Sequence, residues 1–393
     1  MKIVVLGGYG EIGACTSADL AATAKDFDVV VAGRDLEKAE RLVSKLHSKN
    51  LSAARADAHD KEQMKGVLKG ADVLVNATNY YANIDVMKAC LASGVDYIDL
   101  GGLYHMTLKQ LKLDALFRRR GLTAVLGFGS TPGITNVLAL AGSSAFDSLS
   151  SIHIQFGDKD NTKYNTPFVV PYSMHTVFDE FTEKAPVFSG GAMRFVAPLS
   201  GEVNVNFPAP LGRVKCMYAI HSELATMPAS FRTNGLRACS FRGGWDEDFI
   251  RKTKFLIEAG FASSDRVAVN GTSVTPKNFT VSLMNRFIPT GDVRINDMEF
   301  LRVELSGRKS GKQKTVAWYC KTMANKKLNL SAGVWDTGVP PSILAQMMAR
   351  GEVTTVGAKA PESLDIDTGM FFDELDRRGI EISKRDEPSA ERG

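Results

Sequence analysis

From residue 1 to about 130, short apolar runs alternate with amphipathic runs. The apolar runs have the length of buried strands, and the runs between them repeat apolar residues at helical spacing. We expect strands near residues 3–7, 28–32, 51–56, 72–76, 96–100 and 122–127. Strands that alternate with helices predict right-handed crossovers and a doubly wound parallel sheet of the α/β class. In that topology the fourth strand lies beside the first, at the switch point where ligands bind.

Between about residues 150 and 330, apolar and polar residues alternate one by one, as in SSIHIQFG, VNVNF, EFLRVELSG and KTVAWYC. This period is typical of strands with one face toward water. We therefore expect an α+β domain built on a mostly antiparallel sheet. Its exposed face is a predicted dimer surface.

The tail returns to helical spacing, in ILAQMMARG from residue 343 and in MFFDELDRRG from residue 370. Amphipathic helices need a surface to cover, and the first sheet offers one. A chain of 393 residues is also too long for one ordinary core. We expect a dinucleotide-binding domain of residues 1–135, completed by C-terminal helices in 336–393, and an inserted substrate and dimerisation domain of residues 136–335. The final KRDEPSAERG has the composition of a disordered end.

The first expected strand leads into GGYGEIG, where Gly8, Gly10 and Gly13 have the spacing G-x-G-x-x-G. Gly8 allows a tight turn, Gly10 lets backbone amides approach a pyrophosphate, and Gly13 lets the next helix pack closely on the sheet. The anion would rest at the N-terminus of that helix. Three glycines alone are weak evidence, but a strand before them and a helical run after them predict a Rossmann domain.

The second expected strand ends in VVVAGR. NAD-binding units usually carry an acidic residue there, about 20 residues beyond the glycines. Here Ala32 and Gly33 occupy that place, and Arg34 follows. A guanidinium pairs well with a 2′-phosphate, which predicts NADP, with NAD as the alternative. The competing interpretation makes Arg34 a solvated surface residue beside Asp35, the N-cap of the next helix.

Polar side chains follow the fourth and fifth strands. Asn76, Ala77 and Thr78 end the fourth strand and are expected to border the crevice beside the glycines. Asp99 ends the fifth strand, in DYIDLGG, and either faces a ligand or caps the following helix. In the turn GFGSTPGITNV, Gly133 is expected to present backbone amides to the same crevice.

In the second domain, HSELAT brings His221 and Glu223 together directly after an expected strand. Isolated residues of this kind are mostly structural. A titratable pair at a strand end is nevertheless a place for proton transfer, so we name both as candidate catalytic residues.

Bulk composition narrows the functional classes. The net charge of +4 is spread over 48 basic and 44 acidic residues, so no nucleic-acid partner is expected. No run approaches the roughly 20 apolar residues that span a bilayer, and no leader precedes the first strand, so neither a membrane nor export is expected. Five scattered cysteines without a C-x-x-C pair and six scattered histidines favour a cytoplasmic location and no metal site.

Several segments in order resemble the saccharopine dehydrogenase family, in the branch with a Rossmann NADP-binding domain first. Asn79 departs from the family pattern, because relatives often carry a proline there. The resembling segments cover nearly the whole length: GYGEIG, VVVAGRDLEKAERL, VLVNAT, ACLASGVDYIDLGG, STPGITNVLA, YAIHSELATMP, VNGTSVTP, MMARGEVTTVGAKAPESL and FFDELDRRGIEI.

The resemblance implies hydride transfer between NADP(H) and an imine or secondary-amine carbon of an amino acid, saccharopine or a related compound, in a homodimer. It also implies that Asp99 holds a substrate ammonium or the imine proton, and that His221 and Glu223 reach the substrate from the second domain. The fingerprint and the resemblance together name these cofactor-binding residues: Gly7, Gly8, Tyr9, Gly10, Glu11, Ile12, Gly13, Arg34, Asp57, Asn76, Ala77, Thr78 and Gly133.

Three alternatives stay open: a lysine 6-dehydrogenase, a carboxynorspermidine or homospermidine-type enzyme, and a non-catalytic NADP-binding protein. Lysine 6-dehydrogenases generally prefer NAD, so Arg34 tells against the first. A short-chain dehydrogenase is disfavoured, because no tyrosine is followed by lysine at the four-residue spacing that those enzymes need.

Overall fold

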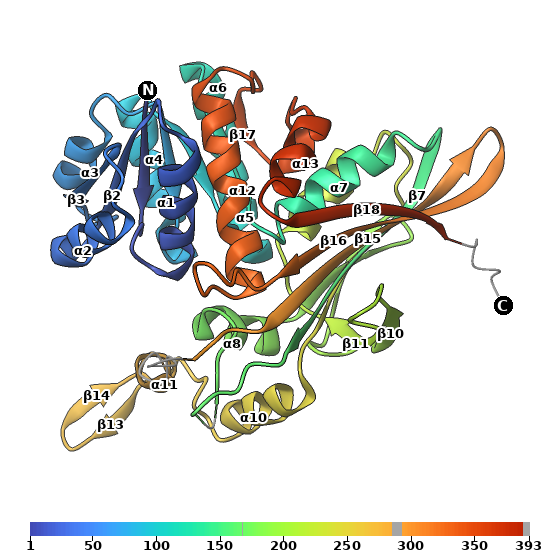
Figure 1. Cartoon of the computed structure of the whole chain (residues 1–393). Helices are drawn as coiled ribbons and strands as arrows, with labels where there is room; N and C mark the ends of the chain where they lie inside the picture. The colour runs from blue at the N-terminus through green and yellow to red at the C-terminus, as the bar shows by residue number, and fades with distance from the viewer. Residues whose placement is uncertain (167, 285–292, 388–393) are drawn as a thin grey trace.

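The structure, a computed structural model, describes residues 1–166, 168–284 and 293–387. Two sheets organise the described chain, each with its own set of helices (Figure 1). The fold is α/β, as the sequence predicts: a parallel doubly wound sheet and a second, mostly antiparallel one.

The first sheet has the strand order β17-β6-β5-β4-β1-β2-β3, and all of its strands run parallel. The six strands predicted near the N-terminus are confirmed, and β4 lies beside β1 at the switch point. Their bounds are β1 Lys2–Leu6, β2 Asp28–Gly33, β3 Leu51–Arg55, β4 Val73–Asn76, β5 Asp96–Asp99 and β6 Thr123–Val125, joined by β17 Gly357–Lys359.

Helices cover both faces of this sheet because its strands are apolar on both sides. Along β1, Ile3 and Val5 belong to one hydrophobic cluster, and Val4 and Leu6 belong to the other. The helices between the strands are α1 Glu11–Thr23, α2 Leu36–Leu46, α3 Lys61–Leu68, the 3₁₀ turn η1 Tyr80–Ala82, α4 Asn83–Ser93, α5 Leu103–Leu111 and α6 Asp114–Arg120.

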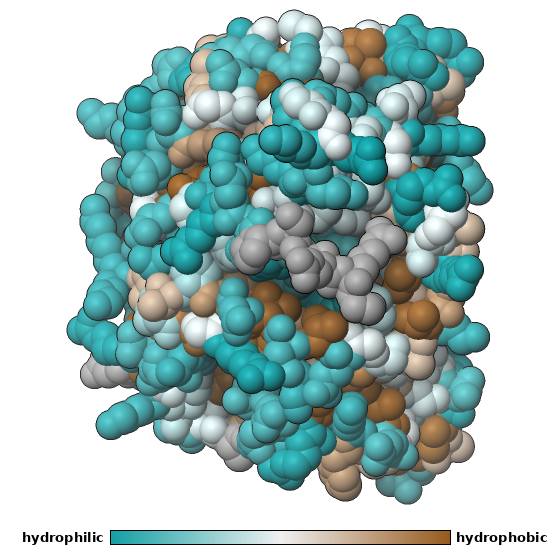
Figure 2. Space-filling model, turned by 90° about the vertical axis from the view of Figure 1, so that its right-hand side faces the viewer, coloured by the Kyte–Doolittle hydropathy of each residue, from teal (hydrophilic) through white to brown (hydrophobic). Residues whose placement is uncertain are grey.

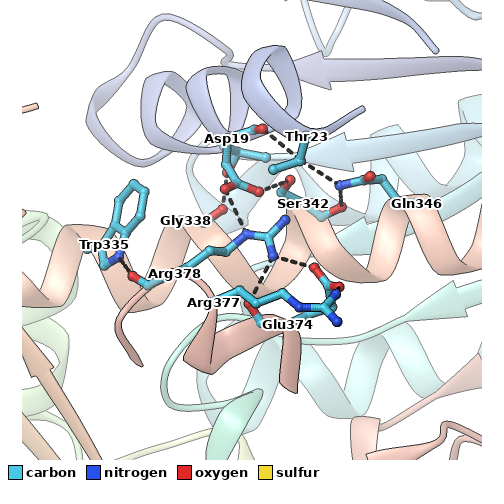
Figure 3. Close-up of polar contacts among 10 residues, drawn as sticks. Asp19, Thr23, Trp335, Gly338, Ser342, Gln346, Glu374, Arg377 and Arg378 are labelled. Carbon is cyan, nitrogen blue, oxygen red and sulfur yellow. Dashed lines mark hydrogen bonds and ion pairs between the residues drawn. The ribbon is translucent and has the colours of Figure 1, made fainter. Parts of the chain in front are cut away.

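Helix α12 (Ala332–Ala349) returns the chain to the first sheet and lies along α1 (Figure 1). It begins well before the helix predicted from residue 343. Figure 3 shows how this return is fixed: Asp19 of α1 accepts hydrogen bonds from Ser342 Oγ at 2.6 Å and Arg378 Nε at 2.8 Å. Arg378 follows α13 (Thr368–Asp376), and its carbonyl accepts from Trp335 Nε1 at 2.9 Å. These contacts join α1, α12 and α13.

The second sheet has the order β10-β11-β12-β7-β15-β16-β18, with β8 and β9 attached to β12. Among its described pairs, β7 and β12 run parallel and the others antiparallel. Its strands are β7 Ser148–Asp160, β8 Ala185–Ser189, β9 Ala192–Val196, β10 Val203–Asn206, β11 Arg213–Tyr218, β12 Ala238–Gly244, β15 Asp297–Lys309, β16 Lys312–Met323 and β18 Ile380–Glu387.

Strand β18 corrects one expectation. The prediction of a disordered end from residue 384 is wrong for Lys384 to Glu387, because these residues pair with β16 as its edge partner. Charged residues suit an edge strand, since they discourage pairing with other chains. The rest of that segment, 388–393, lies outside the described residues.

Helices pack on the second sheet and at its lower end (Figure 1). Helix α7 contacts β15, β16 and β7, whereas α9 contacts β12 and α10 packs on α8. Their bounds are α7 Ile134–Ser143, α8 Met174–Thr182, α9 Glu223–Ser230, α10 Glu247–Glu258, α11 Pro276–Met284 and the 3₁₀ turn η2 Pro361–Ser363. The hairpin β13 Val267–Val269 and β14 Thr272–Val274 projects beside α11.

Candidate active site

The glycine loop after β1 is folded as tightly as the sequence predicts. Gly7 has a φ of +76°, and a Cβ atom added to Gly13 would lie 2.2 Å from Gly7 O, so neither position suits a larger residue. Gly10 is the N-cap of α1 and no side chain caps the helix, so its first-turn amides are left for another partner. Glu11 and Ile12 lie in this first turn.

The predicted cofactor-binding residues follow one edge of the first sheet, in the spatial order of the strands. Asp57 follows β3, where its backbone N–H donates to Gln63 Oε1 at 3.1 Å and its side chain accepts from the His59 amide at 3.0 Å. Arg34 follows β2 and is exposed, with no hydrogen bond or ion pair in the described chain. Tyr9, in the glycine loop, accepts a hydrogen bond from the Asp35 amide through its hydroxyl at 2.9 Å.

The loop after β4 lies against the glycine loop. A Cβ atom on Gly7 would be 2.8 Å from Ala77 O. Asn76 is buried and holds the loop in place, because its Oδ1 accepts from Thr78 Oγ1 at 2.6 Å and its Nδ2 donates to Asn83 Oδ1 at 3.0 Å. These contacts place the two loops side by side at the switch point.

Asp99, at the end of β5, is 1% exposed, and both of its carboxylate oxygens accept hydrogen bonds. Its Oδ1 accepts from the amides of Gly101 at 2.9 Å and Gly127 at 2.7 Å. Its Oδ2 accepts from Tyr97 OH at 2.8 Å, from an Asn83 amide at 3.0 Å and from the Gln110 amide. Burial raises the pKa of Asp99, and these donors oppose the shift. Helix α5 begins after Gly102 without a side-chain cap, so Asp99 does not cap it.

Loops from the two domains meet beside Asp99. The Gly102 amide donates to Ser222 Oγ at 3.3 Å, and a Cβ atom on Gly101 would be 2.9 Å from Pro132 Cγ. Gly133 has a φ of +133° and is the N-cap of α7, and its amide donates to Asn136 Oδ1 at 2.9 Å. The predicted groups around Asp99 and Gly133 are thus adjacent to the segment that carries His221 and Glu223.

His221 and Glu223 form a buried pair, 7% and 0% exposed. His221 Nδ1 hydrogen-bonds Glu223 Oε2, and the imidazole stacks on Phe241 with ring centroids 3.9 Å apart. Glu223 Oε1 accepts from Thr131 Oγ1 at 2.5 Å and Thr135 Oγ1 at 2.9 Å. His221 Nε2 has no hydrogen-bond partner in the described chain, which leaves one ring nitrogen for a ligand.

The electrostatics of the pair follow from burial and from neighbouring carboxylates. Burial alone lowers the pKa of His221, but the Glu223 and Glu180 carboxylates outweigh it and raise that pKa. Burial opposes ionisation of Glu223 too, yet His221 and the Thr131 hydroxyl hold its pKa below the usual range. The pair therefore favours an imidazolium beside a carboxylate.

Glu180 of α8 extends this cluster. It is buried, accepts a hydrogen bond from Tyr172 OH, and its pKa is raised by burial to about 7. Trp245 Nε1 donates to the same tyrosine oxygen at 2.9 Å. Sequence reasoning missed Glu180 because its only local signal is an ordinary amphipathic helix.

Asp179, next to Glu180 in α8, makes a second contact between the loop after β4 and the helices of the second sheet. Tyr80 OH and Tyr81 OH, from the loop after β4, both donate to Asp179 Oδ2, at 2.5 and 3.1 Å. Lys277 of α11 pairs with Asp179 Oδ1. Asp179 is 4% exposed, so this is a buried ion pair with two phenol donors. No local sequence pattern indicates that Tyr80 and Tyr81 bind a residue about 100 positions away.

The residues at the sheet edge fit a dinucleotide. A pyrophosphate and a 2′-phosphate require the features found here: an uncapped helix N-terminus, glycines that leave no space for a Cβ atom, and after β2 an arginine that has no partner among residues 1–166, 168–284 and 293–387. With a buried acid-base pair beside that edge, the arrangement defines an NAD(P)-dependent oxidoreductase.

The comparison with known families agrees. The saccharopine dehydrogenase NADP-binding domain matches residues 3–125, and the saccharopine dehydrogenase C-terminal domain matches residues 129–380. The chain therefore belongs to the saccharopine dehydrogenase family. The predicted family, the oxidoreductase class and the predicted cofactor, NADP with NAD as the alternative, are confirmed at this level.

Among curated relatives, the carboxyaminopropylagmatine dehydrogenase of Synechocystis sp. is 24% identical over 392 residues, which cover 97% of this chain and 96% of that protein. The carboxynorspermidine synthase of Vibrio alginolyticus is 22% identical over 366 residues, 86% of each chain.

Two solved structures share the fold over the full length. Saccharopine dehydrogenase (L-Glu forming) from Saccharomyces cerevisiae has a TM-score of 0.76 at 17% identity, with 98% of this chain and 100% of that chain covered. Homospermidine synthase from Legionella pneumophila, solved in complex with NAD, has a TM-score of 0.68 at 14% identity, with 100% and 93% covered.

Among the described helices, none combines the length and the apolar character needed to cross a bilayer. The described residues also contain no cluster of three or more His, Cys, Asp or Glu side chains placed to hold a metal ion.

Proposed function

We propose that the protein transfers a hydride between NADP(H) and the carbon of an imine or secondary amine in an amino-acid substrate such as saccharopine. The observation that carries this proposal is the buried His221–Glu223 pair, which lies where loops of the second domain meet the carboxyl edge of the first sheet. A carbon–nitrogen hydride transfer needs a group that exchanges a proton with the substrate nitrogen, and this pair supplies one.

In this proposal the bound dinucleotide supplies or accepts the hydride, and the protein moves the proton. Glu223 fixes the orientation of His221 through Nδ1, so that Nε2 gives or takes the proton at the substrate nitrogen. His221 and the Thr131 hydroxyl keep the pKa of Glu223 below its usual range, which favours the carboxylate form. Aromatic stacking on Phe241 keeps the imidazole plane in place.

Asp99 remains a proposed site residue, and we propose that it positions the surrounding loops. Its five hydrogen bonds support a positioning role, because they tie the loop after β5 to the turn after β6 and leave no free lone pair for an ammonium group. The cofactor-binding residues named from the sequence, from Gly7 to Gly133, also stay proposed.

A carboxylated polyamine is the second candidate substrate. Two relatives that match most of the chain are named for such compounds, carboxyaminopropylagmatine and carboxynorspermidine. The buried carboxyl groups of Glu180 and Glu223 around His221 support a substrate rich in amines. Lysine 6-dehydrogenase activity and NADP binding without catalysis are the remaining alternatives.

We also propose a cytoplasmic homodimer with the division into residues 1–135 plus 336–393 and 136–335. The five free, buried cysteines support a reducing compartment. The face of the second sheet opposite α7, which carries the row Gln155, Arg302 and Tyr319, is the surface we propose for the dimer contact. Figure 2 shows hydrophobic residues lying among polar ones on the side of the molecule that is at the right in Figure 1. A monomeric mass in light scattering would refute the dimer.

The substrate panel that tests this function measures the reaction in both directions. NADPH oxidation is measured with 2-aminoadipate semialdehyde plus glutamate, and NADP and NAD reduction is measured with saccharopine, with carboxynorspermidine and with lysine. Turnover of saccharopine or of the semialdehyde with glutamate supports the first candidate, and turnover of carboxynorspermidine alone supports the second. Turnover of lysine alone with NAD, or NADPH binding with no turnover of any amine, contradicts both.

A further inference from the structure

The end of β2 is where the structure departs from an NAD-binding unit. Gly33 is the last residue of that strand, at the place of the usual acidic residue. The ring of Tyr9 lies over it: a Cβ atom on Gly33 would be 2.4 Å from Tyr9 Cε1 and 2.9 Å from Tyr9 OH. A side chain from the glycine loop therefore fills the space that a carboxylate at this position would occupy.

The hydroxyl of Tyr9 is held in place by one hydrogen bond and can still donate another. It accepts a hydrogen bond from the Asp35 amide at 2.9 Å, and its own O–H has no acceptor in the described chain. Arg34, the residue between Gly33 and Asp35, is exposed and also without a partner among the described residues. Two donors without acceptors thus flank the end of β2.

Asp35, the carboxylate that follows Arg34 in the chain, already has partners in α2. Asp35 caps α2 by accepting from the Lys38 amide at 3.1 Å, and Lys38 Nζ lies 3.7 Å from its other oxygen. Its charge is therefore partly balanced within the first turn of the helix, which reduces its repulsion of an incoming anion.

We propose that Tyr9 and Arg34 together bind the 2′-phosphate of NADP(H), with the Tyr9 hydroxyl as a selectivity element that replaces the missing acid. A carboxylate accepts hydrogen bonds from a ribose hydroxyl, whereas a phenol and a guanidinium donate to phosphate oxygens. Gly33 is required because any larger residue displaces the Tyr9 ring. This inference rests on NADP(H) being the cofactor in the proposed function.

The test removes only the phenol oxygen, with Tyr9→Phe, which keeps the ring over Gly33. Calorimetry measures the binding of NADPH and NADH, and of adenosine 2′,5′-bisphosphate and ADP, which lack the nicotinamide. One charge-assisted hydrogen bond predicts about tenfold weaker binding of NADPH and of adenosine 2′,5′-bisphosphate. NADH and ADP should bind as they do to the wild type. Tyr164→Phe, which removes a hydroxyl bonded to Asp160 in the second domain, is the matched control and should change neither.

Equal weakening of all four ligands would overturn the proposal, because it would show that Tyr9 only supports the loop. Unchanged NADPH binding would overturn it as well. Arg34→Ala should weaken the binding of the two ligands that carry a 2′-phosphate, NADPH and adenosine 2′,5′-bisphosphate, more strongly than Tyr9→Phe does. Unchanged binding of these two ligands to Arg34→Ala would contradict the shared site. Failure of the proposed function is distinguishable: it would leave these binding differences intact while no amine substrate is turned over.

Discussion

Replacing Glu223 by Gln changes the charge beside His221 while the shape of the site is kept. Glu223 is fully buried and bonded to His221, Thr131 and Thr135, and a glutamine oxygen can still accept from the two threonines. The variant therefore loses one charge-assisted hydrogen bond to the imidazole. Such a bond is worth roughly 1.5–3 kcal/mol, which corresponds to about a 10- to 100-fold fall in kcat.

The pH dependence gives a second readout with a defined sign. In the wild type the Glu223 carboxylate raises the pKa of His221 against the effect of burial. Without that charge, burial is opposed only by Glu180, so the pKa of His221 falls. The limb of the pH–rate profile that reports loss of the imidazolium should then move to lower pH.

The assay is steady-state NADPH oxidation across pH, with NADPH affinity measured separately. Glu258→Gln, an exposed glutamate at the end of α10, is the matched control and should leave kcat and the profile unchanged. His221→Asn combined with Glu223→Gln should be no slower than His221→Asn alone, because the pair acts as one unit. Glu223→Gln with wild-type kcat and an unshifted profile would refute the reasoning.

Three further changes test other parts of the structure. Gly13→Ala places a methyl group against the glycine loop, and calorimetry should show roughly tenfold or more weaker NADPH binding. Gly66→Ala is the control and should leave NADPH binding unchanged, because a Cβ atom at Gly66 meets no other atom within 4 Å. Asp179→Asn leaves Lys277 without its buried partner and should lower the free energy of unfolding in urea by about 3–5 kcal/mol, with recovery in the double variant that also carries Lys277→Met. Asp336 lies buried in α12, and burial raises the pKa of its carboxyl group. The protonated carboxyl group therefore stabilises the fold in acid, and this stabilisation is lost as the pH rises through the raised pKa. In urea unfolding, Asp336→Asn should be more stable than the wild type at alkaline pH, and the difference should shrink toward acid pH.

The first sheet follows closely from the sequence because its signals are local. Each strand is a short apolar run, and the glycines at 8, 10 and 13 lie directly between a strand and a helix, which is the context that predicts their turn. Helix α12 was predicted too short because Pro340 and Pro341 lie inside it, and proline usually ends a helix. Strand β18 was missed because its charged residues are typical of an exposed tail as well as of an edge strand.

The site was predictable only where its residues are neighbours in sequence. His221 and Glu223 are two positions apart, so the pair could be named without a fold. Thr131 and Glu180, which complete that pair, come from distant segments, and no periodicity links them to it. Asp99 was located correctly at a strand end, but its five partners are set by tertiary packing.

The central claim is that a hydride passes between NADP(H) and a carbon bonded to nitrogen. The most direct measurement uses NADPH with deuterium on the transferred position of its nicotinamide, and mass spectrometry with NMR locates the label in the product of the substrate that turns over. We predict one deuterium on the carbon bonded to the amine nitrogen. Label on a carbon bonded to oxygen, or NADPH consumption with no label in the product, would contradict the account.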